Sequence, residues 1–299
     1  MKHIVSISLG SRSRDYRIEI ELMGEQLLIE RIGVDGDTAE ALRLYREYDG
    51  RVDCFGIGGA TLSISAGRAS YELSHVRRLM QAVRQTPYVD GAGFRDVVER
   101  QMAQAIEAEI AEAVNPRTAL ITCAADRLAM ALSFEELGYE LILGDLAFSL
   151  GVPLALHSMA ALQRLMAVLG PLFRHMPMRW LYPTGQKEDH TEPRFPAWFA
   201  RAGVIAGDCN YIRRHMPQDM AGKIIATNTT TELDVRLFRE RGVTYLVTST
   251  PRLGTRSFGT NVMEATLVAL AGKGRALEPH EVQEMVTLLG WHPNIERLN

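Results

Sequence analysis

Apolar runs separated by polar turns predict an alternating series of strands and helices. In the first third, alternating segments predict strands over Tyr16–Met23 and Gln26–Ile32, which form a hairpin, and a buried strand over Val52–Ile57. Apolar residues at helical spacing predict helices over 38–48 and 74–84. These elements indicate a mixed-sheet α/β domain.

The middle of the chain predicts a strand–helix–strand unit. The segment Thr118–Cys123 reads as a buried strand, Asp126–Leu137 as a helix ended by Gly138, and Glu140–Leu143 as a second strand. Asp145 follows the second strand. This layout is typical of a dinucleotide-binding βαβ unit.

Three further strands follow at regular intervals over Val204–Gly207, Lys223–Thr227 and Thr244–Thr248. Polar residues stand at their carboxyl ends, which is the ligand-binding edge of an open parallel sheet. We therefore expect an α/β fold in which a Rossmann-like doubly wound domain follows the mixed-sheet N-terminal domain.

A domain boundary is expected at Asn115-Pro116, after a long helix predicted over Phe94–Ala113. Residues 1–114 would form the N-terminal substrate or catalytic domain and residues 115–299 the Rossmann-like domain. The latter would include C-terminal helices over 261–270 and 280–289, with no strand after them. The first of these helices could pack back across the domain interface. A proline- and aromatic-rich insertion at about 171–200 could be a lid, a surface excursion or a subunit contact.

The turn Thr122–Ala129 carries alanines where a dinucleotide-binding loop has glycines. One interpretation keeps an NAD or NADP site, with Asp145 on the adenosine ribose. The residues that would line this site are Cys123, Ala124, Ala125, Asp126 and Arg127 at the pyrophosphate and Asn228, Thr229 and Thr230 near the nicotinamide. The other interpretation is a βαβ unit without a dinucleotide, in which Asp126 caps the helix.

A glycine-containing loop leads into the helix that begins near Phe94 and could hold an anionic group. Asp90, Asp208 and Tyr211 are candidates for handling a proton, and arginines would recognise a carboxylate or phosphate. The candidate substrate-binding residues are Gly58, Gly59, Gly91, Gly93, Arg95, Arg213, Arg214, Arg256 and Asn261. Ordinary turns, caps and solvated charges would explain the same residues.

The composition limits the kinds of binding partner that we expect. The 299 residues carry a net charge of −3, which gives no reason to expect nucleic acid. Three separated cysteines and a strand-like N-terminus indicate a reduced, cytoplasmic protein, and no histidine pair has metal-ligand spacing. The apolar stretch 154–172 is interrupted by polar residues, so it predicts a helix that does not span a membrane. The expected partner is a small anionic metabolite, and a homo-oligomer is left open.

Over its whole length the chain resembles bacterial proteins of the quinate/shikimate 5-dehydrogenase-like family. The segments that carry the resemblance are MKHIVSISLGSRSRDYRIE, VDGAGFRDVVER, GVIAGDCNYIRRHMP, ATNTTTELDV and TPRLGTRSFGTNVMEA. A more distant similarity in the order of elements is to acyl-carrier-protein reductases, with Gly58-Gly59, the 90–93 loop and 261–270 in comparable places. These resemblances imply an NAD(P)-dependent oxidoreductase that acts on a small hydroxy or oxo acid in a cleft between the domains.

The alternative hypothesis is a non-redox enzyme or anionic-metabolite-binding protein that keeps the fold without the dinucleotide. The missing glycines favour it. The acidic residue after the second strand favours the oxidoreductase. A structural partner in a complex is a third possibility.

Overall fold

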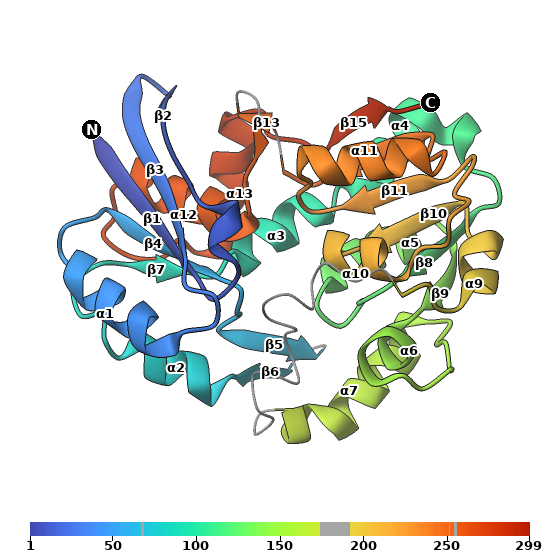
Figure 1. Cartoon of the computed structure of the whole chain (residues 1–299), viewed down its shortest axis with the longest axis horizontal. Coiled ribbons are helices and arrows are strands. Elements are labelled where there is room, and N and C mark those ends of the chain that lie inside the picture. Colours follow the sequence, from blue (N-terminus) through green and yellow to red (C-terminus); the bar gives the residue numbers. More distant parts are fainter. Residues whose placement is uncertain (67–68, 174–191, 251, 254–255) are drawn as a thin grey trace.

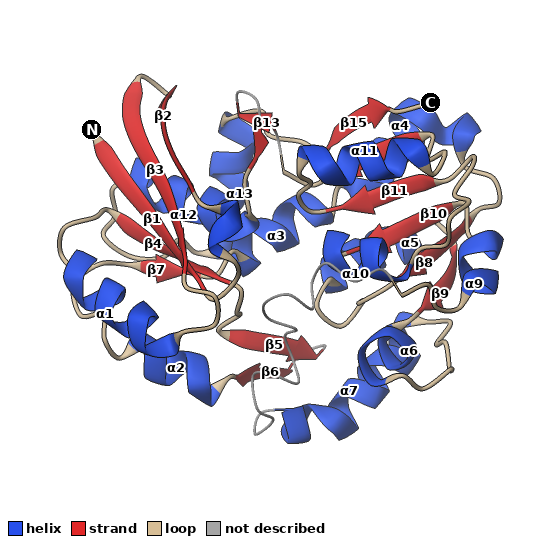
Figure 2. Ribbon diagram, in the orientation of Figure 1, coloured by secondary structure: helices blue, strands red, loops and turns tan. Residues whose placement is uncertain are grey.

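The computed structural model describes residues 1–66, 69–173, 192–250, 252–253 and 256–299. These residues form a mixed α/β protein with two sheets that are mostly parallel and lie on opposite sides of the molecule (Figure 1). Helices surround both sheets (Figure 2). The prediction of a two-sheet α/β protein is confirmed at this level.

The first sheet has the strand order β2-β3-β1-β4-β7. Its strands β1 (Lys2–Ser8), β3 (Glu25–Gly33), β4 (Cys54–Gly58) and β7 (Tyr88–Val89) are parallel, and β2 (Tyr16–Leu22) pairs with β3 in the antiparallel sense. The short hairpin of β5 (Ser63–Ala66) and β6 (Ala69–Glu72) leaves this domain after β4 and approaches the second domain at α7 (Met159–Phe173).

Helices from both ends of the chain cover the first sheet. On one face lie α1 (Thr38–Tyr48) and α2 (Ser74–Met80), packed on strand residues such as Val5. On the other face lie α12 (Thr260–Ala271) and α13 (Pro279–Leu288). Because strand side chains alternate between faces, one short sheet supplies both cores.

The second sheet has the order β15-β12-β11-β10-β8-β9, with β15 (Asn294–Arg297) at one edge. Its parallel strands are β8 (Thr118–Ile121), β9 (Glu140–Leu143), β10 (Val204–Gly207), β11 (Ile224–Thr227) and β12 (Tyr245–Thr248). Two apolar clusters cover its faces. The first contains α4 (Met102–Ile110), α5 (Leu128–Glu136) and α7 (Met159–Phe173), and the second contains α9 (Pro196–Arg201), α10 (Cys209–His215) and α11 (Glu232–Glu240). The remaining short elements are η1 (Arg12–Arg14), β5 (Ser63–Ala66), β6 (Ala69–Glu72), η2 (Ala111–Ala113), α6 (Asp145–Leu150), β13 (Arg252–Leu253) and β14 (Arg256–Ser257).

Two element predictions are wrong. The helix expected over Phe94–Ala113 is two helices, α3 (Ala92–Glu99) and α4, interrupted at Arg100 and Gln101. The interruption lets α3 pack on the first core and α4 on the second. A strand, β15 (Asn294–Arg297), does follow the last helix and pairs antiparallel with β12.

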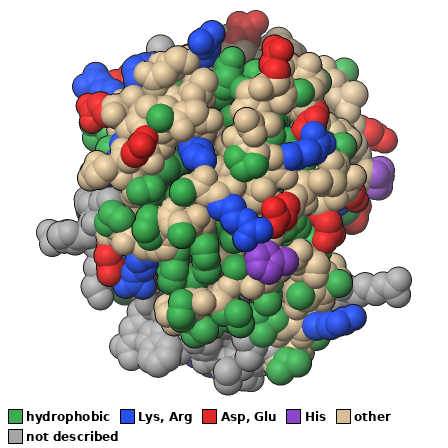
Figure 3. Space-filling model, turned by 90° about the vertical axis from the view of Figure 1, so that its right-hand side faces the viewer, with side chains coloured by type: hydrophobic (Ala, Val, Ile, Leu, Met, Phe, Trp, Pro, Cys, Tyr) green, Lys and Arg blue, Asp and Glu red, His purple; other side chains and the backbone are tan. Residues whose placement is uncertain are grey.

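The distribution of charge on the surface and the length of the helices are relevant to binding partners. On the side shown in Figure 3, acidic and basic side chains are interspersed among apolar ones. None of the described helices has both the length and the apolar character needed to cross a bilayer. The core of the insertion predicted at 171–200, residues 174–191, lies outside the described residues.

Candidate functional site

The strand order of the second sheet reverses at β8, because β9 and β10 lie on opposite sides of it. In open α/β sheets ligands bind outside the carboxyl ends of the strands at such a point. At this point the carboxyl ends of β8 and β10 lie very close together. Gly207 has φ 137°, and a Cβ on it would collide with Thr122 Oγ1, so only glycine fits. The Asp208 amide then donates to Cys123 Sγ at 3.4 Å.

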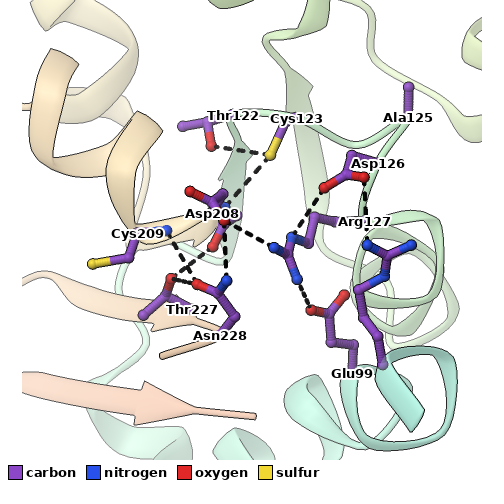
Figure 4. A network of polar contacts seen from close by, with 12 residues as sticks. Glu99, Thr122, Cys123, Ala125, Asp126, Arg127, Asp208, Cys209, Thr227 and Asn228 are labelled. Carbon is purple, nitrogen blue, oxygen red and sulfur yellow. Dashed lines mark hydrogen bonds and ion pairs between the residues drawn. The ribbon is translucent and has the colours of Figure 1, made fainter. Parts of the chain in front are cut away.

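Arg127 connects several carboxylates at this edge of the sheet (Figure 4). Its Nη1 donates to Glu99 and its Nη2 donates to Asp208 Oδ2 at 2.9 Å. Its Nε lies 3.5 Å from Asp126 Oδ2, and Arg95 Nη1 donates to Asp126 Oδ1 at 3.4 Å. The Arg127 side chain is 6% exposed and that of Glu99 is 0% exposed. Burial lowers the pKa of Arg127, but the surrounding carboxylates outweigh it and the pKa is raised.

Asp208 and Asn228 extend this network across the strand ends. Asn228 Nδ2 donates to Asp208 Oδ2 at 3.0 Å, and its Oδ1 accepts from the Cys209 amide at 3.3 Å. Asp208 also caps α10, because its Oδ1 accepts from the Asn210 amide at 2.9 Å. Thr227 Oγ1 donates to Asn228 Oδ1 at 3.1 Å. The ends of three strands and the first residues of two helices therefore share one polar network.

The network holds two guanidinium groups, from Arg95 and Arg127, and three carboxylates, from Glu99, Asp126 and Asp208. Burial raises the pKa of Asp126, but Arg95 and Arg127 together outweigh it and the pKa is lower than usual. Both guanidinium charges are thus compensated within the protein. The exposed part of the network is mostly carboxylate, since Asp126 is 41% and Asp208 21% exposed while Arg95 is 12% exposed.

The turn predicted to hold a pyrophosphate is closed by a carboxylate of the protein. Asp145 Oδ1 accepts from the Ala125 amide at 2.7 Å, so the carboxylate predicted to bind a ribose faces back into the turn. Burial raises the pKa of Asp145 to about 6. Ala124 is buried, and Asp126 does not cap α5. An incoming phosphate would meet Asp145 where it needs amide donors.

The Asp90–Gly93 loop is likewise occupied from within. Asp90 accepts from the amides of Leu62 at 2.6 Å and Ala92 at 3.0 Å. Glu264, from α12, accepts from the Phe94 amide at 3.1 Å, and burial raises its pKa to about 7. The first amides of α3 therefore already have carboxyl acceptors within the protein, which leaves fewer free donors for an added anion.

The other predicted substrate residues are dispersed. Asn261 packs on the face of the first sheet, where its Nδ2 donates to Ser6 Oγ at 2.8 Å. Gly58 and Gly59 close the turn after β4, and a Cβ on Gly58 would lie 2.6 Å from Ser8 Cβ.

Two of the predicted arginines pair with carboxylates of the second domain. Arg213 bonds to Asp234 at 3.3 Å, and Arg214 lies 4.0 Å from Glu192. Arg256 belongs to β14, and its side chain lies outside the described part of the chain.

Three other predicted residues lie close in sequence to members of the network. Tyr211, on α10, is half-buried, and burial raises its pKa. Thr229 and Thr230 are half-buried just before α11, which is capped by Thr231 instead.

The sequence predicted one edge of the sheet for Cys123, Asp126, Arg127, Asp208 and Asn228, and the structure places them there. It did not identify Glu99 as a member of the network. A carboxylate four residues after Arg95 on a helix indicates an exposed i,i+4 pair. Instead its described hydrogen bond goes to Arg127. Among the described residues, no group of three or more His, Cys, Asp or Glu is arranged to hold a metal ion.

Two family models cover nearly the whole chain. One, described as Domain of unknown function (DUF8754), matches residues 93–298, and another, Domain of unknown function (DUF8753), matches residues 3–90. The chain belongs to the DUF8754 family. The two models meet between β7 and α3. No curated protein matches the DUF8754 chain.

Several solved structures show a weak likeness. GanP, a glucose-galactose binding protein from Geobacillus stearothermophilus, is 10% identical with TM-score 0.36, covering 99% of this chain and 97% of its own. A solute-binding protein of an ABC transporter from Burkholderia multivorans is 9% identical with TM-score 0.39, covering 99% and 98%. One from Bacillus halodurans with bound myo-inositol is 12% identical with TM-score 0.36, covering 95% and 96%. Scores this low carry no argument about the ligand of the DUF8754 protein.

The comparisons correct the predicted identity and activity. The family models that match residues 93–298 and 3–90 are described as domains of unknown function and not as dehydrogenases or reductases, so the resemblance to quinate/shikimate dehydrogenases and acyl-carrier-protein reductases is wrong. The prediction of an NAD(P)-dependent oxidoreductase rested on that resemblance and is wrong with it. Asp145 supplies a physical reason, because its Oδ1 accepts from the Ala125 amide, a donor that the pyrophosphate of a dinucleotide would need.

Proposed function

We propose that this protein binds a small polar molecule at the carboxyl edge of the second sheet, on the side that faces the first domain. The observation that carries the proposal is the Arg127–Asp208–Asn228 network at the reversal of strand order. The proposal treats the second sheet as a doubly wound, Rossmann-like domain that retains the usual ligand edge without the dinucleotide loop.

The charges of the network define the ligand class. Both guanidinium groups are already paired, and the more exposed groups, Asp126 and Asp208, are carboxylates. A ligand must therefore donate hydrogen bonds and carry no negative charge, as a neutral polyhydroxylated molecule does. This proposal replaces the anionic metabolite expected from the sequence. Glucose, galactose and myo-inositol, named for two of the similar structures, belong to this class.

Calorimetric titration with a charge-graded panel tests the proposal. The panel contains glucose and myo-inositol as neutral compounds, shikimate and glucose 6-phosphate as anions, and NADH and NADPH for the predicted cofactor. Mass spectrometry of the freshly purified protein searches for a retained molecule. We expect neutral compounds to bind and anions to bind at least about tenfold more weakly.

Two variants distinguish binding at this site from binding elsewhere on the surface. Asp208→Asn should weaken binding about tenfold or more, because a hydrogen bond to a charged acceptor is lost. Glu232→Gln, at an exposed position on α11, is the control and should bind like the original protein. Absence of binding across the panel together with no retained molecule would reject the proposal, as would equal affinities of the two variants.

A further inference from the structure

α3 lies between the two domains (Figure 1) and contacts both. Its apolar side chains, Phe94 and Val98, are buried in the core that α12 and α13 share with the first sheet. Phe94 also packs edge-on against Trp291, with ring centroids 5.7 Å apart. The position of α3 is therefore fixed by the first domain.

A different face of α3 reaches the ligand edge of the second domain. Arg95 and Glu99 are four residues apart, so they project from the same side of the helix. Arg95 bonds to Asp126 and Glu99 bonds to Arg127, both in the turn between β8 and α5. Glu99 is 0% exposed, so no ligand in solvent can touch it.

Arg127 links the contact with α3 to the side chains at the strand ends. Its guanidinium is planar, so Nη1 and Nη2 cannot move independently. Nη1 is held by Glu99, and Nη2 holds Asp208 Oδ2. Asp208 Oδ2 in turn accepts from Asn228. A continuous series of bonds thus runs from a helix fixed by the first domain to the two side chains proposed to meet the ligand.

We propose that Glu99 is a positioning residue for this ligand site. By holding Arg127 it sets the orientation of Asp208 and Asn228, and it makes their geometry depend on where the first domain places α3. The inference rests on the proposed site for its meaning, but its test needs no ligand.

Two backbone amides report directly on the orientation of the Asp208 and Asn228 side chains. The Cys209 amide donates to Asn228 Oδ1 and the Asn210 amide donates to Asp208 Oδ1. Hydrogen exchange of these amides, measured by NMR on the full chain, therefore reads the orientation of Asp208 and Asn228. The Ile205 amide, inside β10, serves as the internal reference for global opening.

Glu99→Gln keeps the shape of the side chain but removes its charge. We expect exchange at Cys209 and Asn210 to accelerate about tenfold relative to Ile205, the change expected for one weakened charge-assisted hydrogen bond. The matched control is Glu136→Gln, because Glu136 pairs with Arg100 at the end of α3 and links the same two helices at the surface. The control should leave the relative rates within about twofold.

Equal acceleration at Ile205, Cys209 and Asn210 would show that Glu99 only stabilises the fold, and unchanged rates would show that it does not orient the site. Either result overturns the inference. If Glu99→Gln does not fold, Arg127→Lys replaces it, since a lysine ammonium cannot hold both carboxylates in a fixed plane, and the same relative acceleration is expected. Ligand titration is independent of these rates, so failure of the proposed function remains distinguishable.

Discussion

Replacing Arg127 by methionine removes a buried charge and leaves its partner in place. Glu99 is 0% exposed and its described hydrogen bond is to Arg127, so Arg127→Met would strand an ionised carboxylate in the interior. Removing one partner of a buried pair costs about 3–5 kcal/mol. Asp208 is 21% exposed and can be rehydrated, so it should add only about 1 kcal/mol or less. The expected loss is thus about 4 kcal/mol of unfolding free energy.

Urea unfolding followed by circular dichroism measures this loss. The double variant Glu99→Leu/Arg127→Met should recover most of it, because no unpaired buried charge remains. The loss should also shrink at mildly acidic pH. Burial raises the pKa of Glu99 even beside Arg127, and without Arg127 the pKa rises further. A carboxyl group with a raised folded-state pKa favours the folded state as pH falls, because the folded state then binds the extra proton.

The result that would refute this reasoning is specific. A loss below about 1 kcal/mol for Arg127→Met would place Glu99 in contact with water, contrary to its burial. A double variant as unstable as the single one would show that the stability comes from the packing of the arginine stem.

Two further predictions concern the junction between the domains. Gly91→Ala should cost about 2 kcal/mol or more, because Gly91 has φ 88° and a Cβ would collide with the Asn261 amide, whereas Gly138→Ala, at φ 75° with open space around it, should cost only about 1 kcal/mol in the same unfolding assay. Glu264 should make the protein less stable as pH rises from about 4.5 towards 7, because its folded-state pKa is raised to about 7 and the stabilising proton is lost through that range. Glu264→Gln keeps an oxygen to accept from Phe94 and should flatten this part of the profile of urea midpoint against pH. An unchanged slope would contradict the assignment to Glu264.

The sequence predicted which polar residues gather at the strand ends, because the geometry of parallel strands is simple. Polar residues after buried strands must gather where the strands end, which brought Asp208, Asn228 and the turn at Arg127 together. The strands themselves were visible as short apolar runs. Edge strand β15 was not, because Asn294–Arg297 is short and largely polar and pairs through its backbone.

The functional interpretation failed where it depended on distant contacts. Glu264 lies 170 residues from Phe94 in sequence, and nothing local shows that it caps α3. Asp145 is 20 residues from Ala125, and a carboxylate in that place is equally expected to bind a ribose or to close its own turn. Glu99 was hidden because a glutamate on an amphipathic helix is normally solvated.

The return of α12 and α13 to the first domain has a consequence for synthesis on the ribosome. The first sheet leaves the exit tunnel within the first 90 residues, but one of its two apolar faces stays uncovered until α12 and α13 have emerged. At about 5–20 residues per second, that face waits roughly ten seconds or more for its cover. During this time Ile4, Leu27 and Ile29 form an exposed apolar surface that can aggregate unless a chaperone binds it. A nascent chain arrested before α12 should therefore be retained by chaperones, whereas the full-length chain released from the ribosome should not be.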